Sequence, residues 1–167
     1  MRLYHASAVI VERPDVYHSR EHLDFGRGFY LTVLRHQAEK YARRFLFRSG
    51  KAYINEYILD DELPGFTRKK FDKYDAGWLD FVGNCRKGIR QQTFDIVEGG
   101  IANDKVFNTI DLYFSGNMSR EDALGRLAFE QPNHQLCILN QEVITHHLHF
   151  VSAEIITKEE GGDHASR

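Results

Sequence analysis

The sequence of 167 residues is poor in cysteine, methionine, tryptophan and proline. Its two cysteines, Cys85 and Cys137, are too few for a disulfide framework and lie in no metal-ligand spacing, so we expect buried thiols. No apolar run approaches the length that crosses a bilayer, and the first residues enter a strand-like pattern rather than a secretion signal. These absences predict a cytoplasmic protein without a membrane partner.

The sequence also lacks an excess of positive or negative charge. The 22 lysines and arginines nearly balance 24 acidic residues, which leaves a formal net charge of −2 and no global basic field for a nucleic-acid partner. Two local clusters are exceptions: one comprises Arg43, Arg44 and Arg48, and the other is the basic run 68–70. Each cluster is either a phosphate-binding edge or a solvated face, and such runs are more often the latter.

The chain has enough apolar residues for one core. Hydrophobic residues make up 42% of the sequence, and no repeat or low-complexity block divides it. We therefore expect a single domain over residues 1–158. The charged, glycine-bearing tail over 159–167 is expected to be disordered.

Hydrophobic periodicity predicts strands near both ends of the chain and helices between them. Strands are expected over 3–7, 28–32, 53–59, 94–97, 134–139 and 148–156, and helices over 34–47, 75–86, 104–114 and 119–129, with a short helix from Gln141. A capping box that begins at Ser119 opens the last of the long helices. This order argues for the α+β class rather than a doubly wound parallel sheet.

One stretch, DFGRGFYLT at 24–32, combines two glycines with a strand-forming run. Its glycines permit positive φ or close backbone approach, whereas the aromatic run favours a half-buried strand. One interpretation is a loop that admits a ligand beside a strand that carries an aromatic ring. The other is a hairpin entry with Phe29 and Leu31 in the core and Tyr30 at the surface, which is more usual for such a segment alone.

Two further stretches bear on the choice: LYHAS at 3–7 and NHQLCIL at 133–139. In this order, the three stretches resemble the histidine-tyrosine-glutamate class of ADP-ribosyltransferases, which includes the diphtheria-like toxins and the poly(ADP-ribose) polymerases. The likeness is closer to a small bacterial family, catalogued as domain-of-unknown-function family 3990, to which the chain is similar from Leu3 to about Phe150. The DFGxGFYLT, DIVxGxxAxD and NHQ stretches of that family all have counterparts here.

The resemblance implies an ADP-ribosyltransferase-like fold, with a split mixed/antiparallel sheet and flanking helices. It implies NAD as co-substrate, no metal, and mono-ADP-ribosyl transfer by a protein that acts as the toxin of a bacterial toxin-antitoxin or defence system. A cognate antitoxin would then be a partner, while the acceptor, a protein or a nucleic acid, is left open. The alternative is a catalytically silent module that binds NAD, ADP-ribose or a nucleic-acid end.

The resemblance also implies a set of residues for the NAD site. They are His5, Ala6, Ser7, Arg20, Gly28, Phe29, Tyr30, Tyr41, Asp104 and Gln135. By resemblance, His5 hydrogen-bonds the adenosine ribose, the backbone at Ala6 holds the nicotinamide carboxamide, and Tyr30 stacks on the nicotinamide ring. Tyr41 matches a second stacking tyrosine, with a place at the edge of the core as the alternative.

The arginine side chains near the first glycine stretch are candidates for phosphate contact. Arg20 or Arg27 would meet the pyrophosphate, because a guanidinium binds phosphate in a bidentate way. The sequence does not choose between the two.

Two residues depart from the pattern of the histidine-tyrosine-glutamate class of ADP-ribosyltransferases. Ala6 stands where glycine is usual, which matters little if only backbone groups are used. Gln135 replaces the glutamate, so a hydrogen-bond acceptor is kept but the charge that faces the ribose cation is lost. Chain elongation is therefore not expected, and Asp104 or Glu98 is a candidate for an assisting acid, with an N-cap as the alternative role of Asp104. A Gln135→Glu variant is expected to keep the fold.

Overall fold

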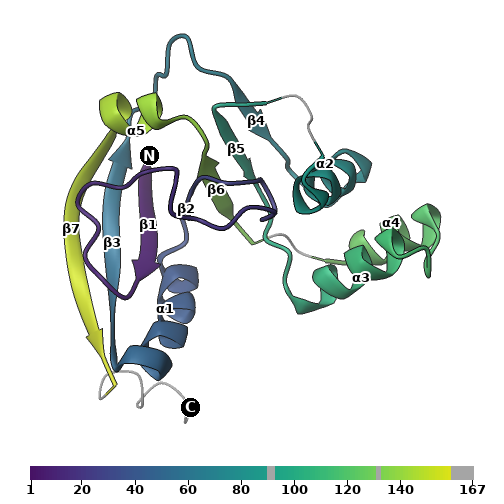
Figure 1. Cartoon of the computed structure of the whole chain (residues 1–167), viewed down its shortest axis with the longest axis horizontal. Helices are drawn as coiled ribbons and strands as arrows, with labels where there is room; N and C mark the ends of the chain where they lie inside the picture. Colours follow the sequence, from purple (N-terminus) through teal and green to yellow (C-terminus); the bar gives the residue numbers. More distant parts are fainter. Residues whose placement is uncertain (90–92, 131–132, 159–167) are drawn as a thin grey trace. The chain divides into compact units, whose positions relative to one another are not determined.

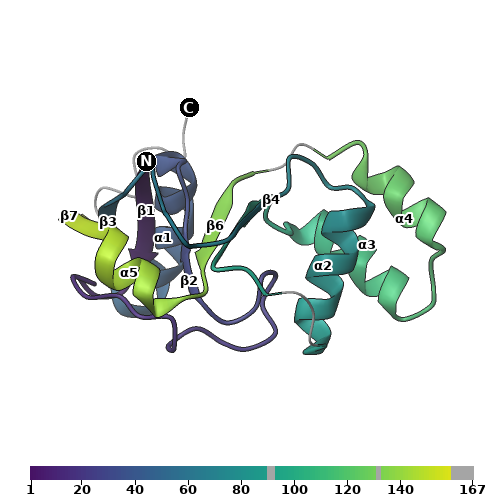
Figure 2. The same ribbon diagram turned by 90° about the horizontal axis from the view of Figure 1, so that it is seen from above.

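The computed structural model describes residues 1–89, 93–130 and 133–158. The tail expected over 159–167 lies outside the described residues. Five helices and two sheets, one antiparallel and one mixed, confirm the α+β class for this part of the chain. Figures 1 and 2 show these elements from two directions.

The chain divides into two compact units. Unit 1 comprises Met1–Asp15, Tyr30–Gly65 and the segment from Gln141 onward, and unit 2 comprises Val16–Phe29 and Phe66–Asn140. The chain thus passes from one unit to the other several times. That residues 1–158 form a single domain stays a prediction.

Unit 1 is built on an antiparallel sheet of three strands in the order β1-β3-β7. Its elements are β1 (Arg2–Ser7), α1 (Arg35–Ser49), β3 (Lys51–Leu59), α5 (Gln141–His147) and β7 (Leu148–Thr157). The register pairs His5 on β1 with Asn55 on β3. The side chain of Asn55 is buried, and its amide donates to the carbonyl of His5 and to the hydroxyl of Ser7, both at 3.2 Å. This amide fixes the end of β1.

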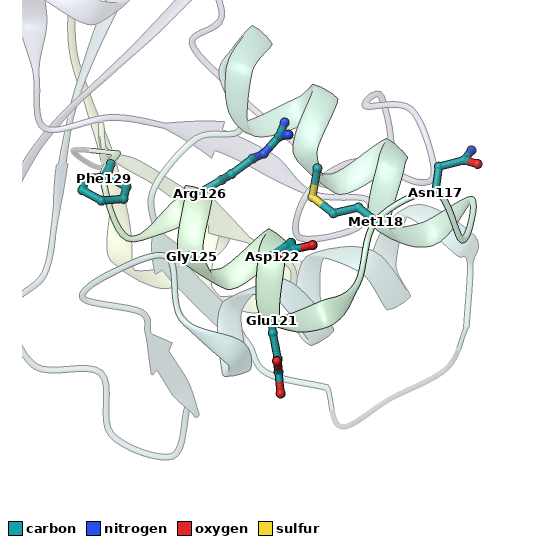
Figure 3. Close-up of a pocket in the computed structure, with 7 residues that line it drawn as sticks. All are labelled: Asn117, Met118, Glu121, Asp122, Gly125, Arg126 and Phe129. Carbon is teal, nitrogen blue, oxygen red and sulfur yellow. The ribbon is translucent and has the colours of Figure 1, made fainter.

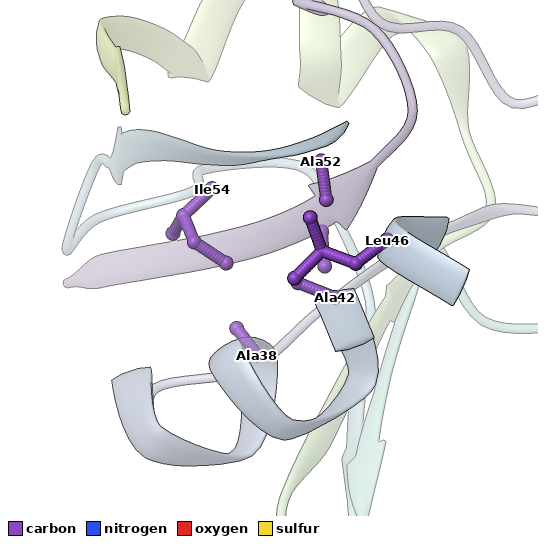
Figure 4. Close-up of a cluster of buried hydrophobic side chains, with 6 residues drawn as sticks. Ala38, Ala42, Leu46, Ala52 and Ile54 are labelled. Carbon is purple, nitrogen blue, oxygen red and sulfur yellow. The ribbon is translucent and has the colours of Figure 1, made fainter. Parts of the chain in front are cut away.

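Helix α1 packs on this sheet through small apolar side chains. Ala38, Ala42 and Leu46 recur at four-residue spacing, so they lie on one face of the helix and meet Ala52 and Ile54 of β3 (Figure 4). Alanine at two of the three helix positions allows the helix backbone to come close to the strands. The helix ends where its C-cap glycine takes a left-handed conformation, with φ of 82°.

Unit 2 contains most of a mixed sheet in the order β2-β6-β5-β4. Its elements are β2 (Phe29–Leu31), which continues into unit 1, β4 (Arg68–Lys70), α2 (Ala76–Lys87), β5 (Ile96–Gly99), α3 (Asp104–Phe114), α4 (Arg120–Leu127) and β6 (Gln135–Ile138). Strand β5 pairs antiparallel with β6 and parallel with β4. The aromatic rings of Phe25, Phe71 and Phe81 pack together in this unit.

Local signals predicted most helix boundaries of unit 2. Ser119 accepts a hydrogen bond from the backbone N–H of Asp122, so the predicted cap of α4 is confirmed. The alternative role of Asp104 is wrong, because Asn103 caps α3 and accepts from the N–H of Val106 at 3.0 Å. Asp104 is the first helical residue instead, where its charge still favours the positive end of the helix dipole.

Strand β4 was not predicted, because its three residues are the basic run 68–70. All three side chains are exposed, and the strand lies at the edge of its sheet. Charged side chains are common on such edges, since they prevent pairing with other chains. The basic run is therefore an edge strand, and its pairing with β5 depends on residues far away in the sequence.

The glycine-rich stretch is held in place by its packing. Phe29 and Leu31 are buried and Tyr30 is half-buried, so the core positions expected of a hairpin entry are confirmed. A Cβ atom at Gly28 would lie 2.5 Å from Sγ of Cys137 and 2.6 Å from the carbonyl oxygen of Ile138. Glycine is thus required at this position by the close approach of β6.

We expect Gly28→Ala to lower the free energy of unfolding by about 1–3 kcal/mol, because the added methyl group overlaps a strand backbone that cannot easily move. Denaturant unfolding measures the change. Gly125→Ala in α4 is the control, since nothing lies within 4 Å of its Cβ position. It should raise the free energy of unfolding by about 0.5–1 kcal/mol. Equal effects of the two substitutions would contradict the packing described for Gly28.

Candidate functional site

The residues predicted for the NAD site are divided equally between the two units. Unit 1 holds His5, Ala6, Ser7, Tyr30 and Tyr41, and unit 2 holds Arg20, Gly28, Phe29, Asp104 and Gln135. That the two sets form one site stays a prediction. The geometry within each unit decides what each set can do chemically.

In unit 1, the structure brings His5 and Tyr30 together. Nδ1 of His5 lies 2.8 Å from the carbonyl oxygen of Tyr30. Because a carbonyl oxygen only accepts, Nδ1 carries the proton, and Nε2 is the acceptor nitrogen of the neutral ring. Burial lowers the pKa of His5 from its ordinary value of 6.5, and the bond to Tyr30 opposes this in part. The ring is therefore neutral at pH 7.

The other three residues of unit 1 have structural contacts of their own. Ala6 belongs to the apolar cluster under α1. The hydroxyl of Ser7 donates to the carbonyl of Val9 and so shapes the loop after β1. Tyr41 lies on α1 with half of its surface exposed, and its ring packs edge-on against Phe45. This position fits the alternative of a tyrosine at the edge of the core.

In unit 2, the carboxylate of Asp24 is the centre of a buried hydrogen-bond network. Its Oδ1 accepts from Nε and Nη2 of Arg86 at 2.9 and 2.6 Å. Its Oδ2 accepts from the backbone N–H of Ala102 at 3.2 Å and from Nε2 of Gln135 at 3.0 Å. Four donors thus surround a buried carboxylate, which is what an ionised group needs when it leaves water.

Gln135 is buried beside this carboxylate. Besides Asp24, its Nε2 donates to the carbonyl oxygen of Gly100 at 3.1 Å. Because a carboxylate and a carbonyl only accept, these partners identify the nitrogen end of the amide. Both amide hydrogens are used, and the carbonyl oxygen Oε1 is the end with capacity for a further hydrogen bond. The network therefore fixes the orientation of the amide.

The network joins the three stretches that carry the likeness to the small bacterial family, through residues that all lie in unit 2. Asp24 begins DFGRGFYLT, Gly100 and Ala102 belong to DIVEGGIAND, and Gln135 ends NHQ. Sequence reasoning missed Asp24 and Arg86 as functional residues. The place of Asp24 at the head of a recurrent stretch was the available signal, whereas nothing local marks Arg86.

Glu98 lies on the other face of the sheet from Gln135. The register pairs Glu98 with Leu136 and Gly99 with Gln135, and neighbouring side chains on a strand alternate between faces. Glu98 instead contacts Nε2 of His134 at 2.8 Å, and that hydrogen bond is the main cause of the lowered pKa of its carboxyl group. This geometry argues against Glu98 as an acid that assists Gln135.

The other predicted residues of unit 2 differ in exposure. Arg20 is exposed, while Arg27 forms an exposed ion pair with Glu21 at 2.8 Å. Asp104 is exposed in the first turn of α3. Phe29 is buried, so a ligand would meet its backbone rather than its ring. None of these side chains belongs to the network around Asp24.

A shallow hollow on the surface of unit 2 is separate from these residues. It lies along α4, between Asn117 and Phe129, and its lining includes Glu121 and Arg126 (Figure 3). It contains none of the predicted NAD-site residues. Its lining is mostly exposed and includes no residue of the network around Asp24, so the hollow is not the functional site.

The described residues show neither a metal-binding group nor a membrane-spanning helix. They hold no group of three or more histidine, cysteine or acidic side chains placed to bind a metal ion. Nδ1 of His147 and Nε2 of His149 both contact the carboxylate of Asp60, at 2.9 Å each. In this same part of the chain, every helix is too short or too polar to cross a membrane.

These observations define an α+β protein with one antiparallel and one mixed sheet, in which one buried carboxylate orients Gln135. The chain belongs to the family described as "Protein of unknown function (DUF3990)", whose model matches residues 1–150. No curated protein and no solved structure matches the chain. The family match covers all the stretches discussed above and describes no activity.

The network revises the expectation for Gln135→Glu. A second carboxylate at this position would lie about as close to Asp24 and to the carbonyl of Gly100 as the amide nitrogen does now, with no proton to share. We expect the free energy of unfolding to fall by about 1–3 kcal/mol or more at pH 8. The repulsion raises the pKa of the introduced carboxyl group, so the loss should shrink as the pH falls toward about 4.

Denaturant unfolding at several pH values measures this effect. Gln141→Glu in the first turn of α5 is the control and should change stability little, since acidic side chains are favourable there. Adding Asp24→Asn to Gln135→Glu should recover part of the loss, because an amide can again donate to a carboxylate. A Gln135→Glu variant as stable as the wild type at pH 8 would refute the network.

Proposed function

We propose that this protein transfers a single ADP-ribose unit from NAD to an acceptor. In this reaction, the bond between the ribose and the nicotinamide breaks, and nicotinamide leaves as a neutral base. The ribose passes through an oxocarbenium-like transition state, and a nucleophile of the acceptor then bonds to the ribose and loses its proton. The proposal rests on the resemblance of LYHAS, DFGRGFYLT and NHQLCIL to the ADP-ribosyltransferases, and on the polar groups that these stretches supply.

The observation that carries the proposal is the fixed amide of Gln135. Its nitrogen is held by Asp24 and Gly100, so its oxygen is oriented before any ligand binds. A preorganised acceptor can hold a ribose hydroxyl without a loss of side-chain freedom on binding. This is the role that the resemblance assigns to the residue at this position.

His5 supports the same proposal from unit 1. Its ring is neutral at pH 7, with the proton on Nδ1 directed at the carbonyl of Tyr30. Nε2 is thus an acceptor nitrogen, of the kind that binds a ribose hydroxyl. The ring of Tyr30, whose carbonyl holds His5, is half-buried and would stack on the nicotinamide.

A second candidate is a module that binds NAD or ADP-ribose without turnover. Gln135 favours it, because an amide brings no negative charge to the ribose cation. Asp24 does not replace that charge, since Arg86 neutralises its carboxylate. We therefore expect slow mono-transfer at most. A role as a toxin with a cognate antitoxin belongs to the first candidate and rests on the resemblance alone.

NAD binding and nicotinamide release separate the candidates. Calorimetry should show NAD binding to the wild type, and Tyr30→Ala should weaken it by about 0.5–1.5 kcal/mol, whereas Tyr30→Phe should change it little, because the ring face is the proposed contact. Thermal unfolding of both variants controls for stability. Equal losses in the two variants would indicate a role of the hydroxyl instead.

The release of nicotinamide by the wild type then decides between transfer and silent binding. Release above the rate without protein supports the first candidate. NAD binding without release supports the second. A wild-type protein that binds neither NAD nor ADP-ribose would refute both.

A further inference from the structure

Helix α1 exposes four cations and two aromatic rings on the side that faces away from the sheet. The cations are Lys40, Arg43, Arg44 and Arg48, and the rings are those of Phe47 and Tyr41. From Lys40, the cations and Phe47 follow at spacings of three, four, seven and eight residues, which places them on one helical face. The buried face, seen in Figure 4, is the opposite one. We name this exposed set the basic face of α1.

Within residues 1–89, 93–130 and 133–158, acidic neighbours do not balance the charges of the basic face. Glu39 is the one acidic residue of α1, and it pairs with Arg35, which also contacts Glu154. Among the described residues, none of the four cations of the basic face forms an ion pair with a carboxylate. Lys40 and Arg44, like Arg44 and Arg48, are four residues apart, a spacing at which like charges destabilise a helix. In a chain of net charge −2, the basic face is thus a local concentration of positive charge that would favour an anionic ligand.

The aromatic rings restrict the kind of anion. Phe47 is 89% exposed and lies between the cations, while the guanidinium of Arg44 lies 5.1 Å from the ring centre of Tyr41. Exposed rings among cations are typical of surfaces on which unpaired bases stack while the phosphates are neutralised. A duplex would offer the phosphates but not free base faces.

We propose that the basic face of α1 binds single-stranded nucleic acid. A membrane surface fits less well, because helices that lie in the interface need a broad apolar face, and the apolar face of α1 is buried against β3. An acidic protein would satisfy the cations but gives no reason for Phe47 among them. The inference is independent of the proposed function, since it rests on residues of unit 1 that the NAD proposal does not use. Tyr41, at the edge of the basic face, is the exception.

Fluorescence anisotropy with labelled 20-nucleotide oligo(dT) and oligo(U), between 50 and 200 mM salt, tests the proposal. If the four cations each meet a phosphate, the logarithm of the binding constant should fall with the logarithm of the salt concentration with a slope of about −3. Arg43→Gln combined with Arg44→Gln should weaken binding and reduce the slope by about 1.4. Phe47→Ala should weaken binding at least about fivefold without a change of slope.

Matched controls lie in unit 2. Phe129→Ala removes a ring that is 88% exposed, and Lys105→Gln combined with Arg126→Gln removes two exposed cations. Both controls should bind the oligonucleotides as the wild type does, and no variant should lower the unfolding temperature. Variants of α1 that bind like the controls would overturn the proposal. The proposal would also be overturned if the wild type did not bind the oligonucleotides at 50 mM salt, or if it bound anionic vesicles and not the oligonucleotides.

Discussion

A carboxylate that leaves water must be surrounded by donors, and this requirement organises unit 2. Asp24 is buried and accepts from Arg86, from the backbone of Ala102 and from Gln135. A buried ion pair of this kind adds little net stability over an apolar replacement, but the loss of one partner leaves a charge without compensation. The network therefore fixes positions more than it stabilises the fold. Its members come from four segments that are far apart in sequence and must come together to satisfy the carboxylate.

The same constraint explains why glutamine suits position 135 in this protein. An amide can donate to the carboxylate of Asp24 and to the carbonyl of Gly100 while its oxygen keeps acceptor capacity. A carboxyl group could not do this, because even its protonated form has one O–H and would donate to only one of these two acceptors. Under the proposed function, Gln135 brings no negative charge to the ribose and so lowers the expected rate. The buried network nevertheless requires an amide at this position. Binding and orientation of a ribose are compatible with this network, whereas strong stabilisation of a cation is not.

Local patterns predicted the elements with strong periodicity or caps. The helix over 104–114 and the strand over 3–7 agree with α3 and β1, because their signals lie within each segment. Strand β4 was missed, since a short basic run becomes a strand only by pairing with β5. In the candidate site, the resemblance pointed to His5, Tyr30 and Gln135. The resemblance did not point to Asp24 and Arg86. Their ion pair joins residues 62 positions apart, which only the tertiary fold brings together.

Hydrogen exchange at the side-chain amide of Gln135, followed by NMR, tests the central claim most directly. Donation to Asp24 and Gly100 should give two well-separated amide resonances that exchange with water far more slowly than those of exposed glutamines. Asp24→Asn should accelerate this exchange even under conditions in which the protein remains folded. A Gln135 amide that exchanges as fast as an exposed one in the folded wild type would contradict the account.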